Sequence, residues 1–219
     1  MSLTVFLVVI AAAILHATWN AAVKGSDDKV LGMTAVIVGQ ALPALALLVF
    51  LPLPSVESLP FFCAGLVFHL GYQIFLISAY QIGDFTQVYP IARGSGPLLV
   101  TLVSIFFLGV ELSPTELAAV GLIVLGIVSL SLVRQGDGLR NPRAAMLAVC
   151  TGICIAGYSL ADGLGARASE SAVGFMASLM LVNGIVFSGY IRLRSPGTMG
   201  QVLRLAKWRM VGGGIASFT

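Results

Sequence analysis

The stretch FTQVYPIARGSGPLLVTLVSIFFL, residues 85–108, decides the fold because it is long, apolar and interrupted by a single charge, Arg93. About 20 helical residues span the ~30 Å hydrocarbon core of a bilayer. Similar apolar runs precede and follow this stretch, separated by short polar connectors. The seven predicted membrane helices are Leu3–Val23, Val30–Leu51, Phe61–Tyr80, Phe85–Leu108, Pro114–Val133, Ala144–Ala161 and Ala172–Ile191. Barrel strands would be only about ten residues long with alternating polarity, so helices are the better interpretation.

The composition supports the same conclusion. Apolar residues make up 58% of the chain and charged residues 10%, and the mean hydropathy is +1.01. This leaves too little polar surface to cover a soluble globule. We therefore predict an all-α fold, a polytopic membrane helix bundle embedded in the lipid bilayer of a cell inner membrane or plasma membrane. Met1–Leu7 lacks a basic region, and the first apolar run reaches full length, so no cleavable signal is expected.

Several classes of function are disfavoured by the sequence. The net charge of +3 comes from lysines and arginines in loops beside helix ends, which does not indicate a nucleic-acid partner. Cys63, Cys150 and Cys154 fall inside predicted spans and are interpreted as small packing residues. No metal-binding helix motif, dinucleotide fingerprint or phosphate loop occurs, so neither a metal nor another cofactor is predicted.

Ser95 lies between two glycines, which superficially resembles the nucleophile motif of an intramembrane serine protease. The residue two positions before Ser95 is Arg93, where a nucleophile elbow would have glycine, and nothing in the sequence places a histidine beside the serine. The chain is therefore not expected to be an enzyme.

An internal repeat is predicted on either side of the polar connector at residues 134–143. Residues 1–138 form a complete five-helix repeat, and residues 139–219 form a second repeat that is cut in its third helix. Trp19 corresponds to Tyr158 in this alignment, at an offset of about 140 residues. Because five is odd, the second copy must enter the membrane from the other side, which gives inverted repeats. A complete second copy would bring the chain to roughly 280 residues, so truncation within an eighth helix beginning near Leu205 is expected.

Four short motifs carry a resemblance to a known family. They are His16-Ala-Thr-Trp-Asn-Ala-Ala-Val-Lys24, Gly83-Asp84, Tyr89-Pro90-Ile91-Ala92-Arg93-Gly94 and Gly109-Val110-Glu111. With these motifs the chain resembles the EamA family of the drug/metabolite transporter superfamily. The resemblance implies a ten-helix carrier of two inverted five-helix repeats with both termini in the cytoplasm. The distribution of loop Lys and Arg residues alone places the amino terminus outside, so both orientations stay open.

Polar side chains inside the first and third spans are candidates for contact with a substrate. His16, Trp19 and Asn20 lie at i, i+3 and i+4, so they form one patch that could seat a small polar molecule or anchor the helix at the membrane surface. His69 and Gln73 share a face of the third span. A histidine there could couple transport to protons or could be a neutral group hydrogen-bonded between helices.

The fourth span contains the strongest candidate, Arg93. It lies about 12 Å into the helix, where an arginine costs ~2.5–3.5 kcal/mol on insertion scales. It could line a cavity and attract a carboxylate, or it could be a structural arginine bonded to helix carbonyls or extended to an interface. Tyr89 shares its face, and Tyr158 and Asp162 occupy one face of the sixth span. Asp162 is expected to cap that helix or meet solvent rather than relay protons.

Other polar and small residues are interpreted as packing groups. Gln40 and Asn183 occupy corresponding middle positions of the two repeats, where hydrogen bonds between helices are expected. Ala148, Gly152 and Ala156 recur at spacing four and should allow a neighbouring helix to approach closely.

The function predicted from these features is transport of a small organic metabolite, such as an amino acid or related solute, by alternating access around a midplane cavity. Export is one of the directions open to such a carrier. The alternative is a non-transporting membrane scaffold or an inactive transporter fragment, and self-association into a homo-oligomer could supply missing helices. The candidate substrate-binding residues are His16, Trp19, Asn20, His69, Gln73, Tyr89, Arg93 and Tyr158.

Overall fold

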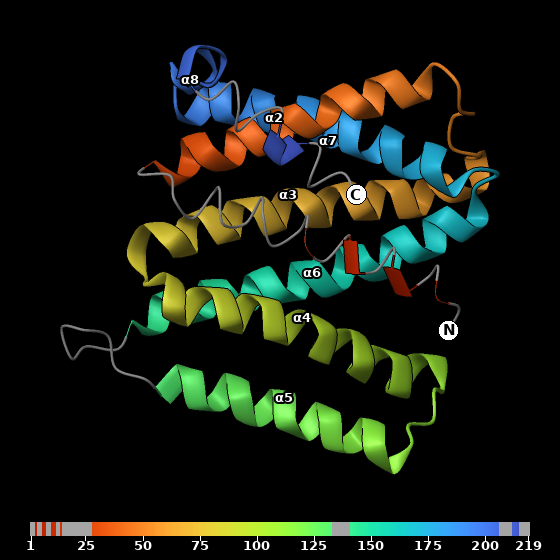
Figure 1. The fold of residues 1–219 in the computed structure, drawn as a ribbon, viewed down its shortest axis with the longest axis vertical. Helices are drawn as coiled ribbons and strands as arrows, with labels where there is room; N and C mark the ends of the chain where they lie inside the picture. Colours follow the sequence, from red (N-terminus) through yellow and green to blue (C-terminus); the bar gives the residue numbers. More distant parts are fainter. Residues whose placement is uncertain are drawn as a thin grey trace. The chain divides into compact units, whose positions relative to one another are not determined.

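The computed structural model describes residues 28–132, 141–205 and 212–214, together with Leu3, Phe6, Leu7, Ile10, Ala11 and Ile14. This described part contains helices and no strand (Figure 1). The main elements are α2 (Lys29–Leu48), the 3-10 helix η1 (Val56–Ser58), α3 (Leu59–Ile82), α4 (Phe85–Leu108), α5 (Pro114–Leu132), α6 (Pro142–Ala168), α7 (Ala172–Arg194) and α8 (Thr198–Leu205).

Five of these segments are long and apolar enough to cross a membrane, judged by length and composition. They are Lys29–Leu48, Val56–Ile82, Thr86–Phe107, Pro142–Ala168 and Ala172–Arg194. The all-α prediction is thus confirmed for the described residues, with helices suited to a bilayer. Helix α5 also forms where a span was predicted, although its apolar described segment, Pro114–Gly126, is shorter. The predicted span Leu3–Val23 and the eighth helix after Leu205 fall largely outside the described residues.

Short polar residues define where several helices begin and end. Asp28 accepts hydrogen bonds from the backbone N–H groups of Val30 and Leu31, at 2.9 and 3.0 Å, and so caps α2. Ser171 caps α7 by accepting from the N–H of Gly174 at 3.0 Å. Helix α4 ends at Gly109, whose φ of 64° is left-handed and therefore suits glycine.

Two compact units can be distinguished, and each is described by itself. Unit 2 comprises residues Pro60–Leu164 and holds most of α3, all of α4 and α5, and most of α6. Only two residues link α3 to α4, so these helices run antiparallel, and α5 packs along α4 (Figure 1). Asn141 ties the start of α6 to the end of α3 because its side-chain amide donates to the carbonyl of Ile82.

Helices α4 and α6 approach closely at glycine positions. A side chain added at Gly152 would collide with Ser95, and one added at Gly96 would collide with Ile155. Ala148 and Ala156, on the same face of α6 as Gly152, are buried. The predicted role of this small-residue face in close helix approach is confirmed.

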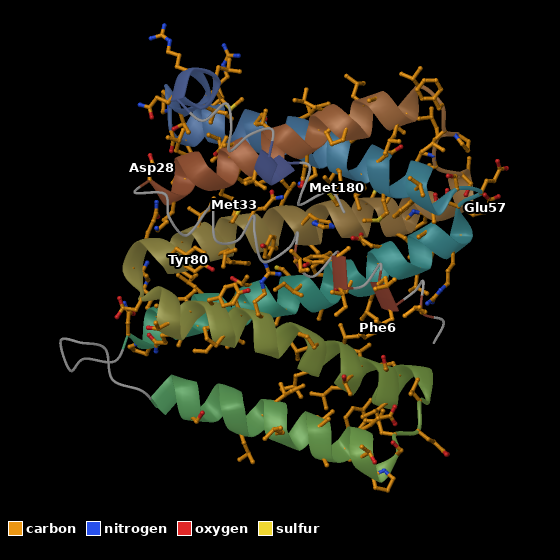
Figure 2. All side chains as sticks on the ribbon, viewed as in Figure 1. Phe6, Asp28, Met33, Glu57, Tyr80 and Met180 are labelled. Carbon is orange, nitrogen blue, oxygen red and sulfur yellow. The ribbon has the colours of Figure 1, made fainter. Side chains whose placement is uncertain are left out.

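Unit 1 comprises Met1–Leu59 and Gly165–Thr219, and its described core is the α2–α7 pair with α8 beside it. Met33 of α2 and Met180 of α7, both marked in Figure 2, are buried in this unit. Gly184 of α7 lies against α2, because a Cβ there would stand 3.1 Å from the Cβ of Ala41. Within the described part of unit 1, α2 and α7 therefore pack through small and flexible apolar side chains.

Two helix boundaries differ from the sequence predictions. Helix α6 continues to Ala168 rather than ending near Ala161, so Asp162 lies inside the helix. The segment after α7, predicted to be a polar connector, contains the short helix α8. Apolar length alone underestimated both helices, because a carboxylate that finds a partner does not end a helix and a short amphipathic helix such as α8 contains no long apolar run.

Candidate functional site

A cluster of polar and aromatic side chains lies between α3, α4 and α6 in unit 2. We call it the polar cluster and define it as His69, Tyr72, Tyr80, Tyr89, Arg93, Tyr158 and Asp162. Four of its members were predicted from the sequence as substrate-binding residues, namely His69, Tyr89, Arg93 and Tyr158. The structure brings these four side chains into one network.

The pair formed by His69 of α3 and Asp162 of α6 is the most specific contact of the cluster. Nε2 of His69 lies 2.8 Å from Oδ2 of Asp162, within hydrogen-bond distance. The two side chains are only 12% and 10% exposed. A carboxylate this well buried requires a strong partner, which the imidazole supplies. The expectation that Asp162 caps a helix or meets solvent was therefore wrong.

Aromatic stacking fixes the imidazole of His69 in place. The ring of Tyr158 stacks on it with centroids 4.2 Å apart and planes inclined by 13°. Tyr158 and Asp162 are four residues apart on α6, so one turn of that helix presents both the carboxylate and the stacking ring to the same histidine. The edge of Tyr72 then meets Tyr158 at 5.8 Å and 77°. This arrangement leaves the imidazole little freedom to rotate.

Arg93 extends the network from α4. Its Nη2 donates to the hydroxyl of Tyr72 at 3.3 Å, and its guanidinium carbon lies 5.8 Å from the ring centroids of both Tyr72 and Tyr89. The guanidinium also interacts with the hydroxyl of Tyr158. Cation–π contacts and hydroxyl acceptors stabilise a cation away from water, which offsets part of the cost of placing arginine in a membrane span.

Tyr80 lies near the end of α3, close to the link with α4 (Figure 2). It is near enough to Tyr72, Tyr89 and Arg93 to interact with them electrostatically. The cluster therefore extends along the helix axes rather than lying in one plane.

The depth of the cluster follows from helix geometry. Arg93 lies eight residues after the start of α4, or about 12 Å from the α3–α4 link. His69 lies ten residues after the start of α3, or about 15 Å from the opposite end. Since a hydrocarbon core is ~30 Å thick, the His69–Asp162 pair falls near the middle of the span.

Two buried oxygen atoms beside this network lack a hydrogen-bond partner among the described residues. They are Oδ1 of Asp162 and Oε1 of Gln73, and Gln73 is only 3% exposed. Gln73 follows His69 by one helical turn, so it shares the face of α3 that was predicted to bind substrate. Unsatisfied acceptors in a buried site are unusual and suit a ligand or proton that supplies a donor.

The remaining predicted contact residues, His16, Trp19 and Asn20, lie outside the described residues. Sequence reasoning did not select Tyr72 as a contact residue, although it follows His69 by three residues and so shares its helix face. The three-residue spacing from His69 could have identified Tyr72. It was overlooked because a hydropathy analysis counts tyrosine as part of the apolar run.

Other parts of the described structure offer weaker candidates for a functional site. Within residues that the structure describes, no group of three or more His, Cys, Asp or Glu side chains could hold a metal ion. An open surface hollow at the α4–α5 turn is lined by Ile105, Gly109, Val110, Glu111, Leu112 and Leu117. This hollow is mostly apolar and offers only Glu111 as a charged group, so the polar cluster is the stronger candidate.

Comparisons with known proteins add information on the fold alone. No family model and no curated protein matches the sequence. A solved structure described only as "Crystal structure of protein" is similar to the chain, with a TM-score of 0.60 and 20% sequence identity. The match covers 97% of this chain and 76% of that one. The helix arrangement thus recurs in a known structure, while the identity is too low to transfer an activity.

Proposed function

We propose that this chain is a membrane carrier for a small organic metabolite, such as an amino acid or related solute, and not an enzyme. The observation that carries the proposal is Arg93, a cation held among tyrosines about 12 Å inside an apolar helix. An ionisable residue inside a membrane span is by default a functional group, because packing alone can be achieved without one.

The chemistry of the polar cluster suits a solute that has a carboxylate and an apolar or aromatic body. The planar guanidinium of Arg93 can bind a carboxylate through two parallel hydrogen bonds. Tyr72 and Tyr158 supply ring faces and hydroxyl groups beside it. Gln73 adds a buried amide oxygen that could accept a hydrogen bond from an amino group.

The wider architecture in this proposal is that of the EamA family, with inverted five-helix repeats at residues 1–138 and 139–219. In such carriers the solute binds near the bilayer midplane and the repeats rock around it to alternate access. The depth estimated for the polar cluster agrees with a midplane site. The proposed location is a cell inner membrane or plasma membrane, where helices of this length and composition are stable.

The test is counterflow in proteoliposomes with a pool of labelled amino acids and other small metabolites. We expect Arg93→Ala to reduce exchange at least about tenfold, since a charge-assisted contact contributes roughly 1.5–3 kcal/mol. Arg143→Ala is the matched control, because Arg143 is an exposed arginine at the start of α6. Insertion of each variant is verified first.

The outcomes separate the proposal from its alternative. Exchange by the wild-type chain that survives Arg143→Ala but not Arg93→Ala supports a carrier with Arg93 at its binding site. Equal exchange by both variants would remove Arg93 from the site. Absence of exchange by correctly inserted wild-type protein would favour a non-transporting scaffold or an inactive fragment.

A further inference from the structure

The buried His69–Asp162 pair is not explained by solute binding at Arg93. A histidine and a carboxylate 2.8 Å apart, each about nine-tenths buried, are held in the middle of helices that are otherwise apolar. Unit 1 shows that helices of this chain can pack through small residues such as Gly184, without any buried ion pair in their described contacts. Burying this pair costs more free energy than packing through small residues would, which indicates that the pair has a role other than packing.

We propose that the His69–Asp162 pair is a proton-binding site and that its protonation is coupled to the binding of an anionic group at Arg93. This inference rests on the proposed carrier function, because coupling has a role only if a solute is moved. The carrier then binds a proton and an anionic solute together and transports them in the same direction.

The chemistry of the pair allows one proton to bind without a change of partner. When the carboxylate of Asp162 is ionised, Nε2 of His69 carries the hydrogen and donates it to Oδ2. The lone pair at Nδ1 then accepts the added proton, which makes the imidazole cationic. The pair passes from a charge of −1 to zero, and the same proton leaves from Nδ1 when the site faces the other side.

The charges around the pair explain why proton and anion should bind together. On α6, the titratable groups that contact His69 are Tyr158 and Asp162, and Tyr72 of α3 meets the edge of Tyr158. From α4, the guanidinium of Arg93 reaches the hydroxyl of Tyr158, and Tyr89 lies beside that guanidinium. With neutral tyrosines, the described cluster sums to zero before protonation and to +1 after it. An anion is repelled by the unprotonated carboxylate, and this repulsion is removed when the pair gains its proton.

Reciprocity follows from thermodynamic linkage. If the proton favours the anion, the anion must favour the proton by the same factor. Where one proton is taken up on binding, the apparent affinity for the anion changes about tenfold for each pH unit and weakens as the pH rises.

The unpartnered Oδ1 of Asp162 is a second feature that fits this role. It is buried and accepts no hydrogen bond from a described residue, so it can accept one from a group that enters the site. An open acceptor beside the histidine fits a proton-binding pair better than an ion pair in which every hydrogen bond is made.

The first experiment measures gradient-driven accumulation and counterflow of a labelled amino-acid mixture by the full chain in proteoliposomes. The variants are Asp162→Asn and the matched control Asp84→Asn, whose carboxylate is exposed before α4 and outside the cluster. A one-unit pH gradient supports about tenfold accumulation when one proton is coupled. We expect wild type and Asp84→Asn to accumulate solute to this extent, and Asp162→Asn to lose the accumulation and the pH dependence of counterflow.

A second experiment measures the protonation state of His69 directly, in the absence of any solute. The chain has only two histidines, His16 and His69, so ¹⁵N-histidine NMR gives two sets of signals, and loss of one set in His69→Gln identifies His69. We expect the His69 signals to change from the neutral to the protonated form when the pH is lowered. The transition should change in Asp162→Asn and stay unchanged in Asp84→Asn.

Each outcome decides between the two proposals. Counterflow by wild type without any response to the pH gradient would overturn the proton site and leave the carrier in place. Loss of all exchange by wild type would overturn the carrier, and the NMR titration then decides the proton site alone. A His69 signal that keeps one protonation state as the pH is lowered would overturn the proton site. If Asp162→Asn fails to insert, the wild-type gradient response and titration remain decisive.

Discussion

The polar cluster of unit 2 and the α2–α7 interface of unit 1 both bury polar side chains between apolar helices. In the cluster these side chains contact one another, from Asp162 through His69 and Tyr158 to Arg93. In the α2–α7 interface, the side-chain nitrogen and oxygen of Asn183 have no hydrogen-bond partner among the described residues, although Asn183 is fully buried. The structure therefore shows no hydrogen bond of the kind expected for Asn183 within the part of the chain that it describes.

This difference teaches what each region requires. Small residues and dispersion contacts are sufficient to hold α2 against α7, in keeping with helix association in lipid. The cluster holds a cation and a carboxylate where both are costly, and it gives each a hydrogen-bond partner, Tyr72 for Arg93 and His69 for Asp162. Chemistry rather than packing is the better reason for such an arrangement.

The largest expected effect concerns the geometry of Arg93. Arg93→Lys keeps the charge but removes the planar fork that reaches the tyrosines, so we expect exchange to fall at least about tenfold. Arg192→Lys, at the exposed end of α7, should leave exchange unchanged. Both variants are compared in the counterflow assay. Full activity of Arg93→Lys would show that only the charge matters and would weaken the contrast with unit 1.

The second expected effect concerns helix approach in unit 2. Gly152→Ala forces a methyl group against Ser95, and overpacking of this kind destabilises a protein by about 1–3 kcal/mol. Gly163→Ala, on the same helix, meets no atom within 4 Å and should stabilise by about 0.5–1 kcal/mol. Unfolding in mixed detergent micelles measures both. Equal changes in stability would mean that α4 and α6 do not depend on close contact.

The smallest expected effect lies in unit 1. Asn183→Leu removes two unsatisfied polar atoms at similar volume, so we expect stability to be unchanged or to rise by up to about 1 kcal/mol. Exchange should stay at the wild-type level. A strong loss of either property would show that Asn183 has a partner in the working protein, and the two regions would then differ less than their contacts indicate.

Much of the fold was predictable from hydropathy. Residues 85–108 form one helix as predicted, through Pro90 and Pro97, because the apolar run and its glycine end signal agree. The extension of α6 past Ala161 was not predictable in this way, since hydropathy counts Asp162 as a break. The carboxylate is accommodated only because a histidine from a distant segment meets it.

The candidate site was partly predictable. Periodicity placed His69 with Gln73 and Tyr89 with Arg93 on single helix faces, and the structure brings three of these side chains into the cluster. No feature of the sequence paired His69 with Asp162, which are 93 residues apart. From sequence alone, a single carboxylate near the end of a predicted span is interpreted as a helix-capping residue, because its hydrogen-bond partner on another helix is not apparent.

By itself, the sequence determined that this protein is helical and suited to a membrane, because each backbone group in lipid must be satisfied within its own helix and apolar length decides which segments can do so. It also determined where charge would be costly, namely at Arg93. Only the tertiary structure decided which helices supply the side chains that stabilise this charge. Contacts between α3, α4 and α6 depend on three-dimensional packing, and packing joined the histidine, the carboxylate and the arginine into one buried network.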